Sequence, residues 1–334
     1  MKIRTLGIDI AKRVFQLHGV DERGKVVLTK RIGRETVLSF IANLPPCLIG
    51  MEACGGANYW ARKFQSYGHT VKLMSPQFVK PYVKTNKTDA TDAEAICEAV
   101  TRPTMRFVAI KQPEQQDMQC LHRYRQRVVE QRTAISNQIR GLLTEYGIVF
   151  AQGIVVLRKR LPEILGDEDV ELNALSKEVF NQLYEDLIAI DDKVKKLDKR
   201  IETFCRENED TQRLTQIGGI GPLTATAMVA AIGDVSQFEN GRHLSAWIGL
   251  VPRERSSGNK RRLLGISKRG DQYLRTLLIH GARSFISHAK ERSTWLDNLI
   301  KRCGKQKAYV ALANKNARVI WALLANHTDY DVAY

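Results

Sequence analysis

Four carboxylates in the first hundred residues have the type and the positions needed to hold Mg²⁺ for phosphodiester chemistry. Asp9 lies inside an apolar Gly-Ile-Asp-Ile run, Glu52 follows the next buried run, and Asp89 and Asp92 are three residues apart. On a helix, that spacing places two side chains on one face. Mg²⁺ takes oxygen ligands and keeps several waters, and two such ions stabilise the attacking and leaving oxygens of a phosphate. We therefore predict a Mg²⁺ site built from these four acids.

Each acid also has a simpler interpretation. Taken singly, a carboxylate is more often a solvated surface group or a helix cap than a ligand. Asp9 is the exception, because a lone charge inside an apolar strand is costly to bury without a partner or a metal. Glu94, in the same predicted helix as Asp92, is expected to be solvated.

A serine pair in the C-terminal third forms a second candidate site. The segment Gly249-Leu-Val-Pro-Arg-Glu-Arg-Ser-Ser-Gly258 contains Ser256 and Ser257, and a run rich in Lys and Arg follows it. Neighbouring positive charge activates a hydroxyl and offsets charge in a transition state, so Ser257 is a candidate nucleophile toward phosphate. Alternatively, the segment binds backbone phosphate through its cations while the serines cap a turn. Ser256 could substitute for Ser257.

A glycine hairpin precedes this segment. Ile217-Gly-Gly-Ile-Gly-Pro222 leads into an apolar run that ends before Gly233, which predicts a tight turn feeding a short helix. Glycines in such a turn let backbone N–H groups approach a phosphate, although many Gly-rich loops are only turns. The residues predicted to bind nucleic acid are Gly219, Gly221, Arg253, Arg255, Lys260, Arg261, Arg262, Lys268 and Arg269.

The elements that must position the acids form an α/β layer. Strands are predicted at 5–9, 14–20, 25–30, 47–51 and 70–74, with helices near 35–42, from 57 and at 90–100. This order of elements is that of an RNase H-like domain. The last segment, 293–325, is predicted to be helical with Trp295, Leu299, Val310, Val319 and Trp321 facing a core.

The middle of the chain is helical and charged. Between 179 and 205 apolar residues alternate steps of four and three, which predicts a coiled-coil seam; they are Leu183, Leu187, Ile190, Val194, Leu197, Ile201 and Phe204. An earlier helix carries Leu121, Val128, Ile135 and Leu142 at seven-residue spacing, with arginines between them. The two helices could pair within one chain or with a second subunit. An internal stalk and an RNA-gripping or dimerising arm both remain open.

Composition favours a polyanionic partner. Lys and Arg number 52 against 36 Asp and Glu, a formal charge of +16 over 334 residues, which favours nucleic acid over membrane. The six cysteines show no C-x-x-C pair, so reduced thiols are expected. No apolar run is long enough to span a bilayer, and we expect a cytoplasmic protein.

Five motifs in order resemble the DEDD transposases of the insertion-sequence family IS110 across nearly the whole chain. They are Gly7-Ile-Asp-Ile-Ala-Lys12, Gly50-Met-Glu-Ala-Cys-Gly55, Lys87-Thr-Asp-Ala-Thr-Asp92, Gly218-Gly-Ile-Gly221 and the segment from Gly249 to Gly258. The stretches 44–53 and 76–84 resemble its IS1111 group.

The resemblance implies an RNA-guided DNA recombinase in three parts. They are a RuvC-like domain over 1–112 with its metal acids at Asp9, Glu52, Asp89 and Asp92, a coiled-coil stalk over 113–208, and a mostly helical transposase domain over 209–334 with Ser257 as the catalytic serine. Members act as oligomers, a dimer and then a tetramer on DNA, in which acids of one subunit and the serine of another form a composite site. A structured guide RNA pairs with double-stranded donor and target DNA.

Three other functions fit parts of the pattern. A RuvC-type nuclease or Holliday-junction resolvase would use the same acids to activate water, with Ser257 only binding phosphate. A sugar or acetate kinase-like ATPase also opens with Gly-Ile-Asp in a first strand, but the expected second Gly-rich phosphate loop is missing. A non-enzymatic nucleic-acid scaffold would use only the stalk and the glycine hairpin.

Overall fold

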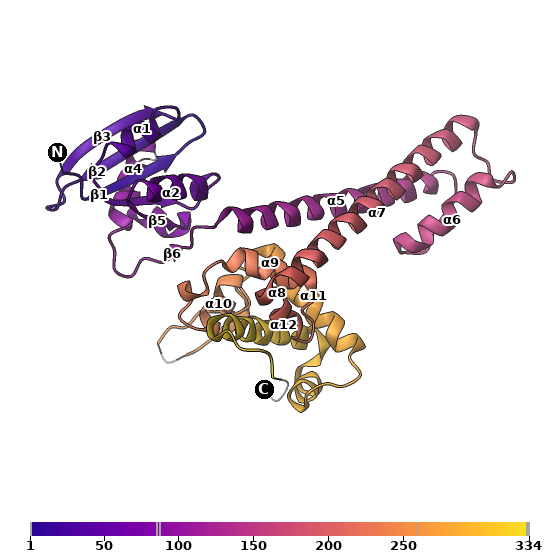
Figure 1. Cartoon of the computed structure of the whole chain (residues 1–334). Coiled ribbons are helices and arrows are strands. Elements are labelled where there is room, and N and C mark those ends of the chain that lie inside the picture. Colours follow the sequence, from indigo (N-terminus) through magenta and orange to yellow (C-terminus); the bar gives the residue numbers. More distant parts are fainter. Residues whose placement is uncertain (1, 85, 87, 259, 332–334) are drawn as a thin grey trace. The chain divides into compact units, whose positions relative to one another are not determined.

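A computed structural model describes residues 2–84, 86, 88–258 and 260–331. By its internal contacts the chain forms two compact units, Met1–Gln115 with Ile232–Glu239 and Gln116–Ala231 with Asn240–Tyr334. Figure 1 traces the elements of each unit. The predicted three-part division at 112 and 208 stays a prediction. Among the described residues, no helix combines the length and apolar composition that crossing a membrane requires.

The first unit is built on a mixed sheet. Its strands are β1 (Thr5–Ile10), β2 (Val14–Val20), β3 (Val26–Gly33), β4 (Leu48–Glu52), β5 (Thr70–Met74) and β6 (Phe107–Val108). Within the described residues the order is β3-β2-β1-β4-β5-β6, with β1, β4 and β5 parallel and the other pairs antiparallel. The predicted strands are therefore present, with their ends shifted by up to three residues.

Helices lie on both faces of this sheet. They are α1 (Val37–Ala42), α2 (Ala57–Ser66), α3 (Pro76–Val79) and α4 (Asp89–Ala99), with the short turns η1 (Lys80–Tyr82) and η2 (Val235–Gln237). Side chains alternate between the faces of a strand. Ile8 and its β2 partner Leu17 are fully buried in a cluster that includes Phe64 of α2, whereas Gly7 lies against α4.

The second unit is mostly helical. Its elements are α5 (Pro113–Thr144), α6 (Ile154–Gly166), α7 (Ala174–Glu207), α8 (Glu209–Thr215), α9 (Pro222–Ile232), α10 (Gly241–Ile248), β7 (Pro252–Glu254), β8 (Leu263–Ile266), α11 (Gln272–His288) and α12 (Thr294–Asn326). The α9 bounds confirm the predicted helix that starts at Pro222 and stops at Gly233.

The two long helices α5 and α7 pack against each other antiparallel. Val128 of α5 shares a buried cluster with Val194 and Leu197 of α7. Arg125 pairs with Asp198 while Arg132, seven residues later, pairs with Asp191, seven residues earlier, at 3.3 Å. The pairing within one chain is thus present, while a regular coiled-coil seam stays a prediction.

The C-terminal helix differs from the prediction in one residue. Leu299 of α12 is buried, and Val310, Val319 and Trp321 are half-buried, but Trp295 is 41% exposed. Trp295 lies on the first turn of α12. Lys315 Nζ lies 4.8 Å from the centroid of the Trp295 ring, in a cation–π contact. The prediction that Trp295 faces a core was wrong, because helix ends lie near solvent and the ring binds a cation there instead.

Candidate functional sites

Two glycines on neighbouring strands set the direction of Asp9 and Glu52. Gly7 of β1 and Gly50 of β4 are register partners in the parallel pair. A Cβ on Gly7 would lie 2.2 Å from the Ala93 carbonyl of α4, and one on Gly50 would lie 2.8 Å from Val100. Residues two apart on a strand share a face, so Asp9 and Glu52 emerge on the face that α4 covers, next to each other on adjacent strands.

Asp89 and Asp92 lie in the first turn of α4. Thr88 caps this turn in a reciprocal box, in which the Thr91 amide donates to the Thr88 hydroxyl oxygen at 3.2 Å and the Thr88 amide to the Thr91 hydroxyl oxygen at 2.9 Å. The cap fixes where the helix begins, and acids in a first turn are favoured by the helix dipole. Lys87, which precedes the cap in the family motif, lies outside the described residues.

The direction of α4 brings its first turn toward the acid end of the sheet. Ala93 and Cys97 both lie against Gly7, and the Cys97 thiol donates to the Thr5 carbonyl at 3.7 Å. Since Thr5 begins β1, the opposite end of α4, which carries Asp92, is directed toward the end of β1 that carries Asp9.

The local electrostatics support the proximity of Asp9 and Glu52. Burial raises the pKa of the Cys54 thiol above its ordinary value, and the charges of Glu52 and then Asp9 raise it further. Glu94, expected to be solvated, is half-exposed and pairs with Lys84 at 3.2 Å; Lys84 also binds Glu98 at 3.0 Å. Glu94 therefore has a cationic partner, Lys84, which it shares with Glu98.

The four carboxylates are suitable ligands for a hard cation, although the described side chains do not form a single cluster. Four carboxylates from two strands and one helix are the oxygen ligands that Mg²⁺ prefers. Within 2–331, the unplaced residues aside, no group of three or more His, Cys, Asp and Glu side chains is arranged to hold a metal. Mg²⁺ keeps several waters, so ligands need not all contact it directly.

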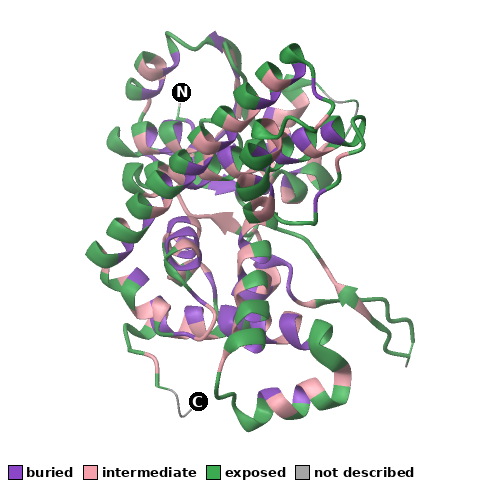
Figure 2. Ribbon diagram, turned by 90° about the vertical axis from the view of Figure 1, so that its right-hand side faces the viewer, coloured by how far each residue is buried: buried purple, intermediate pink, exposed green. Residues whose placement is uncertain are grey.

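Ser257 lies in the connection of an exposed hairpin. Strands β7 and β8 pair antiparallel, and the bridge between Ser257 and Lys260 continues that ladder. The hairpin is exposed from Pro252 through Leu263 wherever it is described (Figure 2). The Ser256 hydroxyl donates to the Glu254 carboxylate at 2.7 Å, which occupies that serine with a neighbour.

The base of the hairpin is held tightly. Gly249 and Gly270 have φ of 83° and 82°, and a Cβ on either would lie about 2 Å from a carbonyl oxygen, that of Arg269 at 2.0 Å or of Trp247 at 1.9 Å. Arg275 of α11, 9% exposed, donates to the carbonyls of Ile248 and Arg269 at 3.0 and 3.3 Å. This clamp fixes both ends of the segment that carries Ser257.

Sequence reasoning did not identify Arg275. The sequence pattern that could have identified it is a cation on the apolar face of a helix. Leu274, Leu278 and Ala282 are the buried apolar residues on that face. Such a side chain must find acceptors when buried.

The predicted nucleic-acid ligands differ in their surroundings. Those in and beside the hairpin are exposed: Arg253, Arg255, Lys260, Arg261, Arg262, Lys268 and Arg269. Arg261 pairs with Glu254 at 3.3 Å. In the glycine turn, Gly221 faces open space, whereas Gly219 packs on α11, with a Cβ 2.7 Å from the Gly281 carbonyl. Gly219 therefore has a packing role of its own, and nucleic-acid binding by the whole set stays a prediction.

The acids belong to the first unit and Ser257 to the second. Each site is accordingly described by itself.

Comparisons with known proteins match both the N-terminal part and the C-terminal part of the chain. Residues 211–296 match the family model described as "Transposase IS116/IS110/IS902 family", and residues 6–148 match a DEDD family model described as "Transposase". The chain is 51% identical over 98% of its length to the "Transposase for insertion sequence element IS1111A" of Coxiella burnetii, covering 91% of that protein. It is 47% identical to the "Probable family 20 transposase" of Pseudomonas aeruginosa, with 99% of each chain covered. The "Transposase for insertion sequence element IS1328" of Yersinia enterocolitica is 38% identical, with 98% of each covered.

Proposed function

This chain belongs to the IS116/IS110/IS902 family of DNA transposases, and from that premise we propose that it exchanges DNA strands by Mg²⁺-assisted attack of Ser257 on a phosphodiester. The proposal rests on one observation: in β1 and β4 a glycine packed against α4 is followed two residues later by an acid. This arrangement directs Asp9 and Glu52 to the face of the sheet beside α4. The order β3-β2-β1-β4-β5 supports an RNase H-like, RuvC-like interpretation of this unit.

The acids supply the anionic half of the site. Asp9 and Glu52, with Asp89 and Asp92 on α4, would hold Mg²⁺, which when bound stabilises negative charge on a phosphate under attack. The strand-borne acids are fixed by the sheet, so they would hold the ion without reorganisation.

Ser257 supplies the nucleophile. Its oxygen forms a bond to phosphorus while the bond from phosphorus to the 3′ oxygen breaks; the serine proton is lost to solvent and the 3′ oxygen gains one. The products are a phosphoserine-linked strand and a 3′ hydroxyl. A 3′ hydroxyl of another strand then attacks the phosphoserine and releases the serine. The number of phosphodiester bonds is conserved, so no external energy source is needed.

The partners follow from the same proposal. We propose double-stranded donor and target DNA, a structured guide RNA that supplies sequence specificity by base pairing, and an oligomer in which the acids and the serine of different subunits meet. The net charge of +16 and the exposed cations of the hairpin support polyanionic partners. The three-domain division at 112 and 208 belongs to this proposal.

A covalent trapping assay tests the function. The protein, with RNA that copurifies with it, is incubated with labelled DNA and Mg²⁺, and products are resolved on denaturing gels. We expect a protein–DNA adduct that is lost in Ser257→Ala and Asp9→Asn and without Mg²⁺, but kept in Ser256→Ala.

The alternative is a RuvC-type nuclease that hydrolyses DNA with water, favoured by the acids alone. Cleavage without an adduct in the wild type would favour that alternative. An adduct that survives in Ser257→Ala would instead show that another protein group is the nucleophile and would exclude Ser257 from that role.

A further inference from the structure

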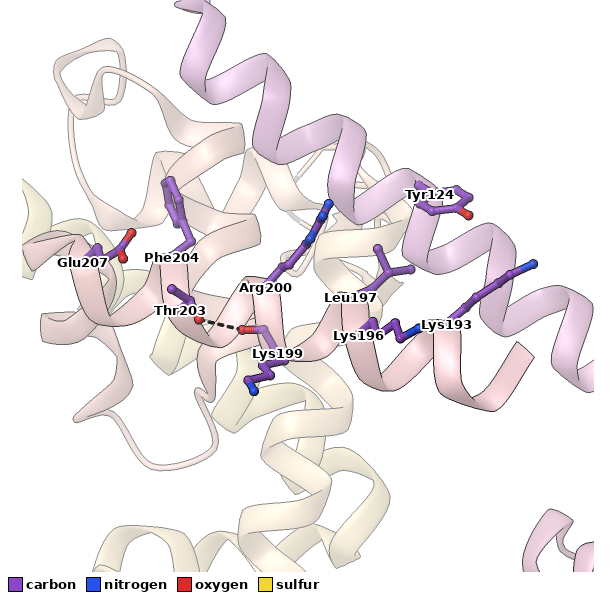
Figure 3. Close-up of a pocket in the computed structure, with 9 residues that line it drawn as sticks. All are labelled: Tyr124, Lys193, Lys196, Leu197, Lys199, Arg200, Thr203, Phe204 and Glu207. Carbon is purple, nitrogen blue, oxygen red and sulfur yellow. Dashed lines mark hydrogen bonds between the residues drawn. The ribbon is translucent and has the colours of Figure 1, made fainter. Parts of the chain in front are cut away.

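A basic groove lies between α5 and α7, and its lining contains none of the residues that the proposed chemistry uses. Its volume is about 630 Å³. Figure 3 shows the residues that line the groove: Leu197 and Arg200 of α7 extend toward α5, which carries Tyr124, whereas Lys199 extends from the opposite side of α7. The residues that matter are four cations and two aromatic rings: Lys193, Lys196, Lys199, Arg200, Tyr124 and Phe204.

The cations follow one helical stripe. Lys193, Lys196 and Arg200 are three and four residues apart, so they share a face of α7. At 1.5 Å of rise per residue the stripe from Lys193 to Arg200 is about 10 Å long. A stripe of this length can contact more than one phosphate of a single strand.

These cations make no ion pair within the described residues, although the charge of Lys196 helps to lower the pKa of Asp192. Two other α7 cations outside the groove do make one: Lys195 with Asp192 at 2.9 Å and Arg206 with Glu202 at 4.0 Å. Like charges on one face repel, so an uncompensated stripe favours an anionic ligand. Glu207 lies at the far end of the stripe and bounds it.

The groove also presents aromatic surface. Tyr124 is 54% exposed, and Phe204 is half-buried beside Leu197. Exposed rings beside cations are the combination on which unpaired bases stack while their phosphates are neutralised. A duplex keeps its bases stacked on each other, so the rings would add nothing to its binding.

We propose that this groove binds an unpaired nucleic-acid strand, with phosphates on Lys193, Lys196 and Arg200 and a base stacked on Tyr124. The inference rests on the proposed function, in which DNA strands are separated and a structured RNA is held. It adds a binding site on the helical part of the chain. RNA and single-stranded DNA share the recognised chemistry, and the experiment distinguishes them.

Fluorescence anisotropy of the full chain tests the groove. The probes are a labelled 12-nucleotide oligouridylate, the matching oligothymidylate, a 12-base-pair duplex and polyglutamate. The variant changes Lys193, Lys196 and Arg200 to Gln. A control with the same net charge changes Lys195, Arg206 and Arg127 to Gln, which are exposed cations outside the groove.

We expect the groove variant to bind the unpaired probes about tenfold more weakly than the control. The slope of log affinity against log salt should fall by about 2, because each lost phosphate contact on a single strand contributes about 0.7. Tyr124→Ala should weaken binding by about tenfold, and Tyr124→Phe should restore it because the ring is kept. The stronger of the two unpaired probes identifies RNA or DNA as the occupant.

Three results would overturn the inference: equal binding by the groove variant and its control, a loss of duplex affinity in the groove variant that exceeds its loss for the unpaired probes, or a groove-dependent affinity for polyglutamate that exceeds that for the oligonucleotides. Each leaves the adduct assay of Asp9→Asn and Ser257→Ala unaffected. Failure of the groove is therefore distinguishable from failure of the strand-exchange function.

Discussion

The acid end of the first unit and the serine hairpin of the second are built in opposite ways. Asp9 and Glu52 extend from strands whose glycines contact α4, so their direction is part of core packing. Ser257 lies in an exposed connection of a two-stranded hairpin held only at its base. An isolated two-stranded hairpin is marginally stable. The direction of the acids is thus fixed by core packing, whereas the position of Ser257 depends on the clamp at the base of its hairpin.

The largest expected effect is a loss of stability when the glycine contact between β1 and α4 is changed. Gly7→Ala places a methyl group 2.2 Å from the Ala93 carbonyl, which α4 can relieve only by moving. We expect a loss of about 3 kcal/mol or more in the free energy of unfolding, measured by urea denaturation. Gly55→Ala, where a Cβ meets no atom within 4 Å, is the matched control. Equal stability of the two variants would remove the argument that α4 packing directs the acids.

A slightly smaller effect concerns pH and the support of α11. His122 of α5 is buried, and its ring nitrogens bond the Tyr273 and Thr226 hydroxyls, each at 3.0 Å. Burial, and then the charge of Arg125, lower the pKa of His122 from 6.5 to about 4. Between those values the unfolded chain binds the proton and the folded chain does not, so stability falls as the pH falls through this window.

The expected loss from pH 6.5 to pH 4 is about 3 kcal/mol. His122→Gln should remove this part of the pH dependence of the free energy of unfolding. Urea unfolding at several pH values measures the change. The exposed His288→Gln should keep the pH dependence. An unchanged profile in His122→Gln would show that other groups cause the acid sensitivity.

A third change tests the clamp. Arg275→Met leaves the Ile248 and Arg269 carbonyls without their donor, at a cost of about 2 kcal/mol. We expect faster tryptic cleavage within the hairpin and a weaker adduct signal, while metal dependence is kept. Arg283→Met, an exposed position on the same helix α11 and outside the hairpin, serves as the control. Wild-type cleavage kinetics in Arg275→Met would mean that the hairpin holds its place without the clamp.

The smallest effect sharpens the choice between the serines. The Ser256 hydrogen bond, and then Arg261, hold the pKa of Glu254 below its usual range. Glu254→Gln removes that charge from an exposed hairpin, so the melting temperature should not change and the rate of adduct formation should shift by about twofold or less. A large gain of adduct in the background of Ser257→Ala would instead reveal Ser256 as a substitute nucleophile.

Much of the first unit could be predicted from the sequence alone. Short runs of β-branched and other apolar residues predicted β1, β2, β4 and β5, because such runs fit a buried, pleated strand. The helix predicted at 90–100 is α4, which begins one residue earlier at Asp89; its cap at Thr88 was not identified from the sequence. The positions of Asp9 and Glu52 on their strands followed from the same local pattern.

What the sequence could not supply depended on contacts distant along the chain. The hairpin that carries Ser257 has no alternating pattern of its own; it exists because Gly249 meets Arg269 and because Arg275 binds carbonyls on both sides of it. Trp295, which reads as apolar core, is exposed at a helix end. Local pattern determined which residues form strands and helices and where the acids sit on them. Only the tertiary structure decided which glycines contact a neighbouring backbone, which arginine is buried and which long helices pair, because those outcomes depend on the packing of segments far apart in sequence.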